Sequence, residues 1–200
     1  MLLNEKLKNY RLVLASGSPR RREIFKILGF DFQIVTKETE EVYPETLEAE
    51  KVSEYLAVLK AAAFEKEINA DEKLIVITAD TTVIIDGKII GKPKDRNDAI
   101  NILKTLAGKK HTVCSGVCIK NSKKQKVFTA LTDVWFKELS DEEIEFYVDN
   151  FKPFDKAGAY AVQEWIGAAA ISRIEGSYYN VVGLPSKMLY VELEDFVNSL

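Results

Sequence analysis

The amino-acid sequence predicts an α/β protein, a single domain over residues 1–200 in which helices flank a mixed, twisted central sheet. Three observations support this prediction. The run Leu74-Ile75-Val76-Ile77 is apolar throughout, as in a strand that is covered on both faces. Strand-like segments alternate along the chain with segments whose apolar residues recur at helical spacing. Asp86-Gly87 lies between two apolar runs and signals a two-residue hairpin, which adds antiparallel pairing.

The first part of the chain is expected to form two strands and two helices. A short strand over residues 11–15 precedes a helix over residues 19–28, which Gly29 terminates. The apolar side of that helix consists of Ile24, Phe25, Ile27 and Leu28. A second strand is expected over residues 32–35. A long helix over residues 47–68 follows, because apolar side chains recur there at helical spacing. These side chains are Val52, Tyr55, Leu56, Leu59 and Ala63.

The second part continues the alternation. The strand from Leu74 is expected to end at residues 78–81, and a hairpin of residues 82–85 and 88–90 follows it. Ser140 begins a capping box that opens a helix reaching about residue 150. The remaining elements are expected as a helix over 96–106, strands over 111–120, 126–136 and 168–175, a loop over 151–158 and a helix over 185–197.

Composition excludes several classes of protein. The formal charge of −3 for 200 residues argues against a general nucleic-acid binder, which carries a basic excess. A lysine cluster between two strand-like runs is expected at a solvated hairpin tip. It consists of Lys123, Lys124 and Lys126. Cys114, Cys118 and His111 are too few ligands for a zinc site, so the cysteines are expected to be reduced thiols. No segment resembles a membrane span or a cleavable leader, and we expect a cytoplasmic protein without membrane or nucleic-acid partners.

Small residues and arginines stand together where the first helix begins. Ser16-Gly17-Ser18 exposes backbone N–H groups at the start of a helix, an arrangement that binds anions. The helix dipole disfavours cations in the first turn, so an anionic ligand would explain the arginines that follow Pro19. Because successive helical residues point about 100° apart, we expect Arg20 and Arg21, and not Arg22, to reach that ligand. A solvated basic helix start is the alternative.

Charged groups also follow the buried strand. Ligands of open α/β sheets gather at the carboxyl ends of strands, where Asp80 is expected. Its carboxylate is either a cap for the next turn or a catalytic group. Lys92 is held extended by Pro93, and it is either an ion-pair partner of Asp80 or a phosphate clamp.

An acidic run occupies residues 38–41, before the long helix. Such a run is either a solvated face or a source of metal ligands. Mg²⁺ takes one or two carboxylates from a protein and completes its shell with phosphate oxygens, so the second interpretation suits polyphosphate chemistry. The one histidine lies in a strand-like run without a nucleophile motif, which argues against a serine or cysteine triad.

Several segments form a combined signature, in order, over nearly the whole chain. They are Ser16-Gly-Ser-Pro-Arg-Arg21, Ala79-Asp-Thr81, Gly91-Lys-Pro93, Asp155-Lys-Ala-Gly-Ala-Tyr160 with Gln163, Gly176-Ser-Tyr178 and Val182-Gly-Leu-Pro185. Each segment is weak alone. Together they resemble the Maf family of nucleoside triphosphate pyrophosphatases, also called septum formation inhibitor Maf.

The resemblance implies hydrolysis of a nucleoside triphosphate to the monophosphate and pyrophosphate, with Mg²⁺ or else Mn²⁺ or Co²⁺. It also implies a homodimer and a fold shared with inosine triphosphate pyrophosphatases. The form of residues 155–160 followed by Gln163 is similar to the branch that acts on dTTP and UTP, and not to the branch that acts on methylated guanosine triphosphate.

The same resemblance implies roles for individual residues. Asp80 matches the proton acceptor and Glu41 a further active-site position, for which Glu40 is the second choice. From their carboxylates we also expect Asp80 and Glu41 to hold the metal. Lys60 and Lys92 match further active-site positions. The positions tied to substrate choice are Arg20, Thr81 and Gln163, and the substrate-binding set also includes Ser16, Ser18 and Arg21.

Two positions differ from the family's pattern. The family usually reads Gly-Ile-Gln-Gly where this chain places Glu164 and then Trp165 directly after Gln163. Thr78 replaces the glycine expected before Ala79. The alternative function is a non-catalytic, nucleotide-binding regulator of septum formation, which would need the arginines but not the carboxylates. The cellular role is either cleansing of the nucleotide pool or control of cell division.

Overall fold

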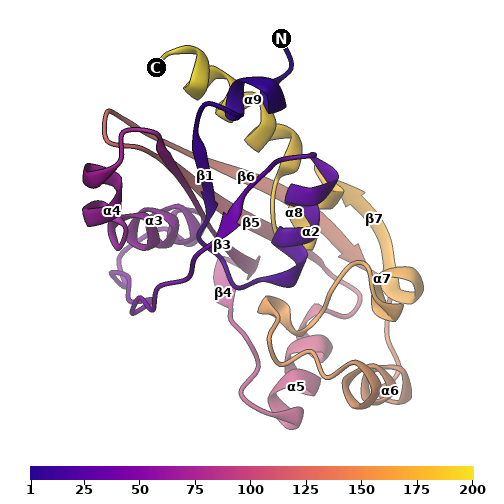
Figure 1. The fold of residues 1–200 in the computed structure, drawn as a ribbon. Helices are drawn as coiled ribbons and strands as arrows, with labels where there is room; N and C mark the ends of the chain where they lie inside the picture. Colours follow the sequence, from indigo (N-terminus) through magenta and orange to yellow (C-terminus); the bar gives the residue numbers. More distant parts are fainter. The chain divides into compact units, whose positions relative to one another are not determined.

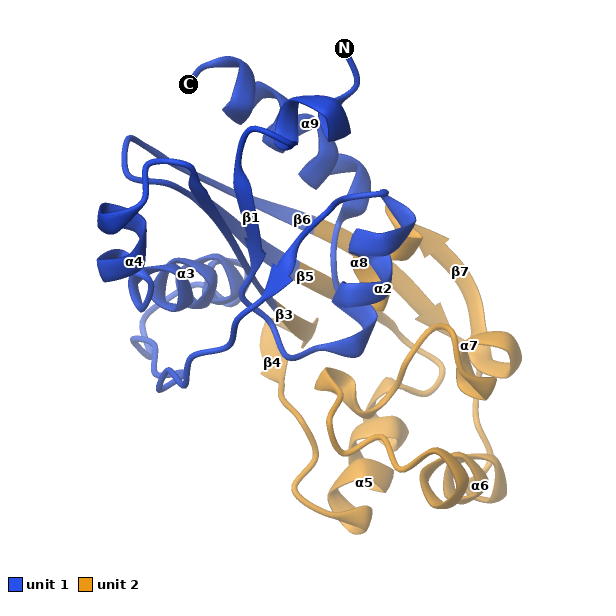
Figure 2. Ribbon diagram, in the orientation of Figure 1, with its two compact units in different colours: residues 1–80, 115–130, 183–200 blue, residues 81–114, 131–182 orange.

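Helices and strands alternate through residues 1–200, all of which are described by a computed structural model (Figure 1). The chain divides into two compact units (Figure 2). Unit 1 comprises residues 1–80, 115–130 and 183–200, and unit 2 comprises residues 81–114 and 131–182. None of the helices has both the length and the apolar character that a membrane crossing requires.

Three strands contribute residues to both units: β3 (Leu74–Ile85), β5 (Lys110–Lys120) and β6 (Gln125–Phe136). The other elements of unit 1 are α1 (Leu3–Leu7), β1 (Arg11–Leu14), α2 (Pro19–Ile27), β2 (Gln33–Ile34), α3 (Ala49–Ala62), α4 (Glu65–Ala70) and α9 (Ser186–Asn198). Those of unit 2 are β4 (Lys88–Ile90), α5 (Arg96–Leu106), α6 (Asp141–Phe151), the 3₁₀ turn η1 (Ala157–Ala159), α7 (Trp165–Ala170), β7 (Ile171–Glu175) and α8 (Tyr178–Val182).

The strands form a mixed sheet. They hydrogen-bond in the order β2-β1-β3-β5-β6-β7, and β4 pairs with β3. β1 is parallel to both β2 and β3, whereas the β3–β4 and β6–β7 pairs are antiparallel. The predicted α/β fold with a mixed sheet is therefore confirmed.

In unit 1 the sheet packs against α4 through alternate strand residues. Val13 of β1 and Leu74 and Val76 of β3 point to the same face, where they contact Phe64 and Ile68. The β1–β3 ladder ends with Leu14 opposite Ile77. Beyond that pair β3 continues without β1, so the residues after Ile77 lie at the carboxyl end of the parallel pair.

Small residues let α3 lie directly on the sheet. Ala57 and Ala61 of α3 pack on Cys118 of β5. At Gly116 the contact is closer still, because a Cβ atom there would lie 2.3 Å from the backbone carbon of Ser53. Gly116 therefore sets the distance between β5 and α3, the helix that carries Lys60.

The turn between β5 and β6 is tied to α9. The side-chain oxygen of Asn121 accepts the backbone N–H of Lys124, which stabilises the turn. The ammonium of Lys124 donates to the carbonyl of Phe196 and lies 4.3 Å from the centre of its ring. Lys126 forms an ion pair of 2.8 Å with Glu192. The predicted hairpin tip is confirmed, but two of its lysines contact α9 and not solvent alone.

Unit 2 has its own apolar core. The β3–β4 hairpin turns through Asp86 and Gly87, both at positive φ as a type I′ turn requires. Helix α6 opens with the predicted capping box, in which Ser140 and Glu143 each accept the other's backbone N–H. Side chains from β3, α5, β5, β6, α6 and α7 fill the core. They include Val83, Leu103, Val113, Phe136, Tyr147, Tyr160 and Ile166.

One prediction about β3 is wrong. The strand does not end at residues 78–81 but runs unbroken from Leu74 to Ile85. The sequence suggested a break because Asp80 interrupts the apolar run. The structure accommodates this polar residue in the strand because a lysine neutralises its carboxylate, as described below.

Other predicted boundaries are also corrected. The helix expected over residues 47–68 is two helices, α3 and α4, which separate where Phe64 turns into the core of unit 1. The strand expected from residue 168 begins only at Ile171, because the alanine-rich stretch before it completes α7. Ile27 and Tyr55, expected on apolar faces, are 65% and 41% exposed. Helices α1, α7 and α8 were not predicted.

We expect Gly116→Ala to lower the free energy of unfolding by about 1–3 kcal/mol, because the methyl group would push α3 away from β5. Urea denaturation measures this change. Gly91→Ala is the control, since no atom lies within 4 Å of a Cβ at that position. Equal stability of the two variants would contradict the close contact between β5 and α3.

A buried histidine makes the stability depend on pH. His111 is 1% exposed, and its Nε2 lies 2.7 Å from the hydroxyl of Tyr160. Burial lowers the pKa of His111 to about 4, although the carboxylate of Asp133 opposes the shift. Between pH 6.5 and 4 the unfolded chain therefore binds a proton that the folded chain excludes, and stability falls as the pH falls.

We expect the wild type to lose about 3 kcal/mol from this residue across that pH range, and His111→Gln to lose none of it. Urea denaturation of both proteins at pH 4 to 7 gives the difference between their slopes. Parallel pH profiles would show that His111 titrates normally in the folded state.

Candidate active site

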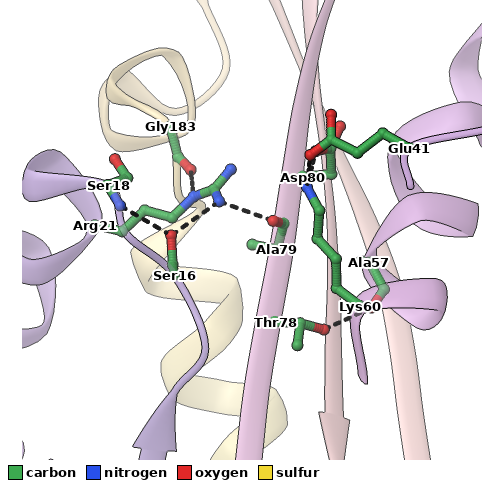
Figure 3. A network of polar contacts seen from close by, with 10 residues as sticks. All are labelled: Ser16, Ser18, Arg21, Glu41, Ala57, Lys60, Thr78, Ala79, Asp80 and Gly183. Carbon is green, nitrogen blue, oxygen red and sulfur yellow. Dashed lines mark hydrogen bonds and ion pairs between the residues drawn. The ribbon is translucent and has the colours of Figure 1, made fainter. Parts of the chain in front are cut away.

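The site in unit 1 is built around residues 78–80 of β3, which pass between α3 and the start of α2 (Figure 3). Side chains two apart on a strand share a face, so Thr78 and Asp80 both point toward α3. Thr78 is fully buried, and its hydroxyl donates to the carbonyl of Ala57 at 2.6 Å. Thr78 thus joins β3 to α3.

Lys60 lies one turn after Ala57 on α3, and its side chain forms a second link between α3 and β3, an ion pair with Asp80. Its ammonium is 2.5 Å from Oδ1 of Asp80 and 2.8 Å from Oε1 of Glu41 (Figure 3). Asp80 is buried, and the Lys60 side chain is 18% exposed. The structure therefore brings three predicted residues together, because the carboxylates of Glu41 and Asp80 both contact the ammonium of Lys60. Glu41, and not Glu40, is the glutamate at this place.

The two carboxylates suit a divalent cation that also binds phosphate. Glu41 and Asp80 both contact the same ammonium, so their oxygens already converge on one positive charge. No group of three or more histidine, cysteine, aspartate or glutamate side chains forms a complete protein cage for a metal. Two carboxylates with phosphate oxygens filling the other positions are the usual ligands of Mg²⁺.

Arg21 occupies the other side of β3. Its Nε donates to the carbonyl of Gly183 at 2.9 Å, and one terminal nitrogen donates to the carbonyl of Ala79 at 2.8 Å (Figure 3). The same nitrogen lies 3.3 Å from the hydroxyl oxygen of Ser16. Burial lowers the pKa of the Arg21 guanidinium, and the negative charge of Asp80 opposes this shift. Arg21 thus joins three separate segments.

The hydroxyl of Ser16, and not that of Ser18, binds the backbone at the start of α2. Ser18 occupies the N-cap position with extended backbone angles, but its side chain forms no capping hydrogen bond. Instead the hydroxyl of Ser16 accepts the backbone N–H of Ser18 at 3.3 Å. Arg20 is half-buried and Arg22 exposed. The basic first turn is as predicted, with Arg21 turned toward the protein's own carbonyl groups.

In unit 2, the segments around Lys92 and Gly158 contact each other. The backbone N–H of Gly158 donates to the carbonyl of Gly91 at 3.1 Å. A Cβ at Gly158, which has a φ of 71°, would lie 2.9 Å from a methyl group of Val83 on β3. The side chain of Lys92 is exposed beside this contact, and Thr81 is half-buried on β3.

Gln163 is exposed on a tight turn, in which the N–H of Glu164 donates to the carbonyl of Ala161 at 3.1 Å. It lines an open hollow of about 510 Å³ in unit 2. The other residues of this hollow come from the turn, α7, β7 and the start of α8. They are Val162, Glu164, Gly167, Ala168, Ile171, Ser172, Arg173, Ile174 and Tyr178.

Sequence reasoning missed the groups that hold the site in place. The carbonyl groups of Ala79 and Gly183, which bind Arg21, are backbone atoms without a residue-type signal. Both residues lie in motifs of the signature, and this is the one signal that pointed to them. The hydrogen bond from Thr78 to α3 was also missed, because threonine is common in strands.

Comparison with known proteins places the chain in a family. A family model described as Maf-like protein matches residues 11–196. A dTTP/UTP pyrophosphatase of Flavobacterium psychrophilum is 46% identical over 192 residues, 96% of this chain and 97% of the relative. A dTTP/UTP pyrophosphatase of Porphyromonas gingivalis is 48% identical over 196 residues, 98% of each chain.

Among solved structures, the Ham1 protein of Staphylococcus aureus matches with a TM-score of 0.55. The match covers 93% of this chain and 99% of that chain at 18% sequence identity, and it shows that the two share a fold. The family model and the full-length relatives support a closer relationship than a shared fold, because they match the amino-acid sequence itself. On that ground the chain belongs to the Maf family.

Proposed function

We propose that this chain hydrolyses dTTP and UTP to the monophosphate and pyrophosphate. The observation that carries the proposal is the convergence of Glu41 and Asp80 on Lys60 at the carboxyl end of the β1–β3 pair. The arginines of α2 lie in the same unit. The names of relatives that match nearly the full length support the choice of substrate.

In this mechanism Asp80 acts as the general base. Its carboxylate orients a water molecule and accepts a proton from it as the water oxygen attacks the α-phosphorus. A new P–O bond forms, the bond between the α-phosphorus and the bridging oxygen breaks, and pyrophosphate leaves. Lys60 and Arg20 offset the negative charge of the triphosphate. The backbone N–H of Gly17, between Ser16 and Ser18, adds a donor for a phosphate oxygen.

A divalent metal would be held by Glu41 and Asp80, and Mg²⁺ is the metal that we propose. When bound, it neutralises phosphate charge. Lys60 positions the two carboxylates for this task, because its ammonium already holds both of them. Arg21 orients the segments around Ser16 and Ala79, and its guanidinium adds positive charge to the phosphate-binding region.

Three residues are proposed for substrate choice: Arg20, Thr81 and Gln163. The amide of Gln163 donates to a pyrimidine carbonyl and accepts the ring N–H of uracil or thymine, a pattern that cytosine does not present. Thr81 adds a hydroxyl, and Lys92 is a further phosphate-binding cation.

We also propose that residues 1–200 act as one domain, that the chain forms a homodimer, and that it works in the cytoplasm. Its cellular role would be cleansing of the nucleotide pool or control of cell division.

Asp80→Asn should lower kcat for dTTP by about 10²- to 10⁴-fold, because the amide cannot accept the proton. Pyrophosphate release in the presence of Mg²⁺ measures this, and circular dichroism checks the fold. Asp86→Asn is the matched control, since it makes the same change at the β3–β4 turn, where asparagine tolerates a positive φ.

Turnover by Asp80→Asn at the wild-type rate would remove Asp80 from the reaction. A wild type that binds triphosphates and hydrolyses none of them would instead favour the non-catalytic regulator.

Gln163→Ala should narrow the preference for dTTP over CTP and GTP by about tenfold, because two hydrogen bonds to the base are lost. The ratio of kcat/KM values measures the preference. Gln125→Ala, at the start of β6, is the control for loss of an exposed glutamine. An unchanged ratio would exclude Gln163 from base recognition.

A further inference from the structure

The turn that presents Gln163 is fastened at both ends to one buried hydroxyl. The backbone N–H of Ala161 donates to the hydroxyl of Tyr147 at 3.2 Å. That hydroxyl in turn donates to Oε2 of Glu164 at 2.5 Å. Since Ala161 and Glu164 are also joined by the turn's own hydrogen bond, Tyr147 closes a ring around the segment that carries Gln163.

The hydroxyl is a rigid support. Tyr147 comes from α6 and is fully buried, and its ring stacks with those of Phe151 and Trp165 at centroid distances of 5.1 and 6.5 Å. Burial and the Glu164 carboxylate both raise the pKa of Tyr147 above its usual value, so the hydroxyl keeps its proton as a donor. The position of the turn is therefore set by the core of unit 2.

A buried lysine compensates the charge of Glu164. The ammonium of Lys156 lies 3.4 Å from Oε1 of Glu164 and 2.7 Å from Oδ1 of Asp155. The Lys156 side chain is 9% exposed, so these carboxylates replace much of its water. Without Glu164 the lysine would keep Asp155 alone, and a buried charge with fewer partners is costly.

We propose that Tyr147 and Glu164 are specificity-positioning residues, which hold Gln163 in the orientation that reads the base. This inference rests on the proposed function. Neither residue touches the substrate in it, because both act on the backbone that flanks Gln163.

Tyr147→Phe removes the hydroxyl and keeps the ring. We expect the ratio of kcat/KM for dTTP to that for CTP to fall by up to about tenfold, the loss expected for Gln163→Ala, because an amide that is no longer held in place pairs poorly with the base. We expect kcat/KM for CTP to stay within about twofold of the wild type. A change that only weakened the fold would lower both values together, and the ratio separates these cases.

A double-mutant cycle tests whether Tyr147 acts through Gln163. In the Gln163→Ala background, Tyr147→Phe should leave the dTTP to CTP ratio unchanged, because the group that Tyr147 orients is gone. Glu164→Gln is the second variant and should give a smaller loss, since an amide oxygen still accepts the hydroxyl. Glu145→Gln, an exposed position on α6 that pairs with Arg96, is the control.

Hydrogen exchange of residues 161–164 in the protein without substrate tests the hydrogen bonds of Tyr147 to Ala161 and Glu164 independently of activity. Tyr147→Phe should speed the exchange of these amides, the Ala161 N–H included, while those of α5 stay protected. An unchanged dTTP to CTP ratio in Tyr147→Phe, or additive effects with Gln163→Ala, would overturn the proposal. A wild type that does not prefer dTTP and UTP over CTP would overturn the proposed substrate choice, and the exchange result would still decide whether Tyr147 holds residues 161–164 in place.

Discussion

The ion pair between Lys60 and Asp80 is the interaction on which the site in unit 1 depends. A carboxylate within a buried strand is costly unless an opposite charge meets it. Lys60 meets it from α3, and the hydrogen bond from Thr78 to Ala57 holds the same helix on the same strand. The close contact of Gly116 with α3 brings that helix near enough for both. An uninterrupted β3 and a buried carboxylate within it are thus compatible.

Arg21 has the complementary role on the other side of β3. It binds backbone carbonyl groups of Ala79 and Gly183, so the start of α2, the middle of β3 and the segment before α9 keep a common geometry. The two cations differ in what they hold. Lys60 holds two carboxylates, which can also bind a metal ion. Arg21 holds neutral carbonyl groups. This difference favours an internal role for Arg21 and a role in charge compensation for Lys60.

Local signals predicted much of the fold. The Asp86-Gly87 turn, the capping box at Ser140 and the stop at Gly29 depend on a few neighbouring residues, and the structure has each of them. The errors arose where distant contacts decide. Phe64 breaks the long helix because it enters the core beside β1, and Asp80 stays in a strand because Lys60 neutralises it. The signature motifs contain Arg21 and Asp80, but nothing in them shows that Arg21 binds the backbone carbonyl groups of Ala79 and Gly183.

The sequence by itself determined the family, the α/β class and the identity of the charged residues, because these follow from residue types and their order. Only the tertiary structure decided which charges meet. It placed Glu41 and not Glu40 on Lys60, turned Arg21 to the protein's own carbonyl groups, and tied the Gln163 turn to Tyr147. The physical reason is that hydrogen bonds and ion pairs act over a few ångströms, between atoms whose separation depends on how whole helices and strands pack.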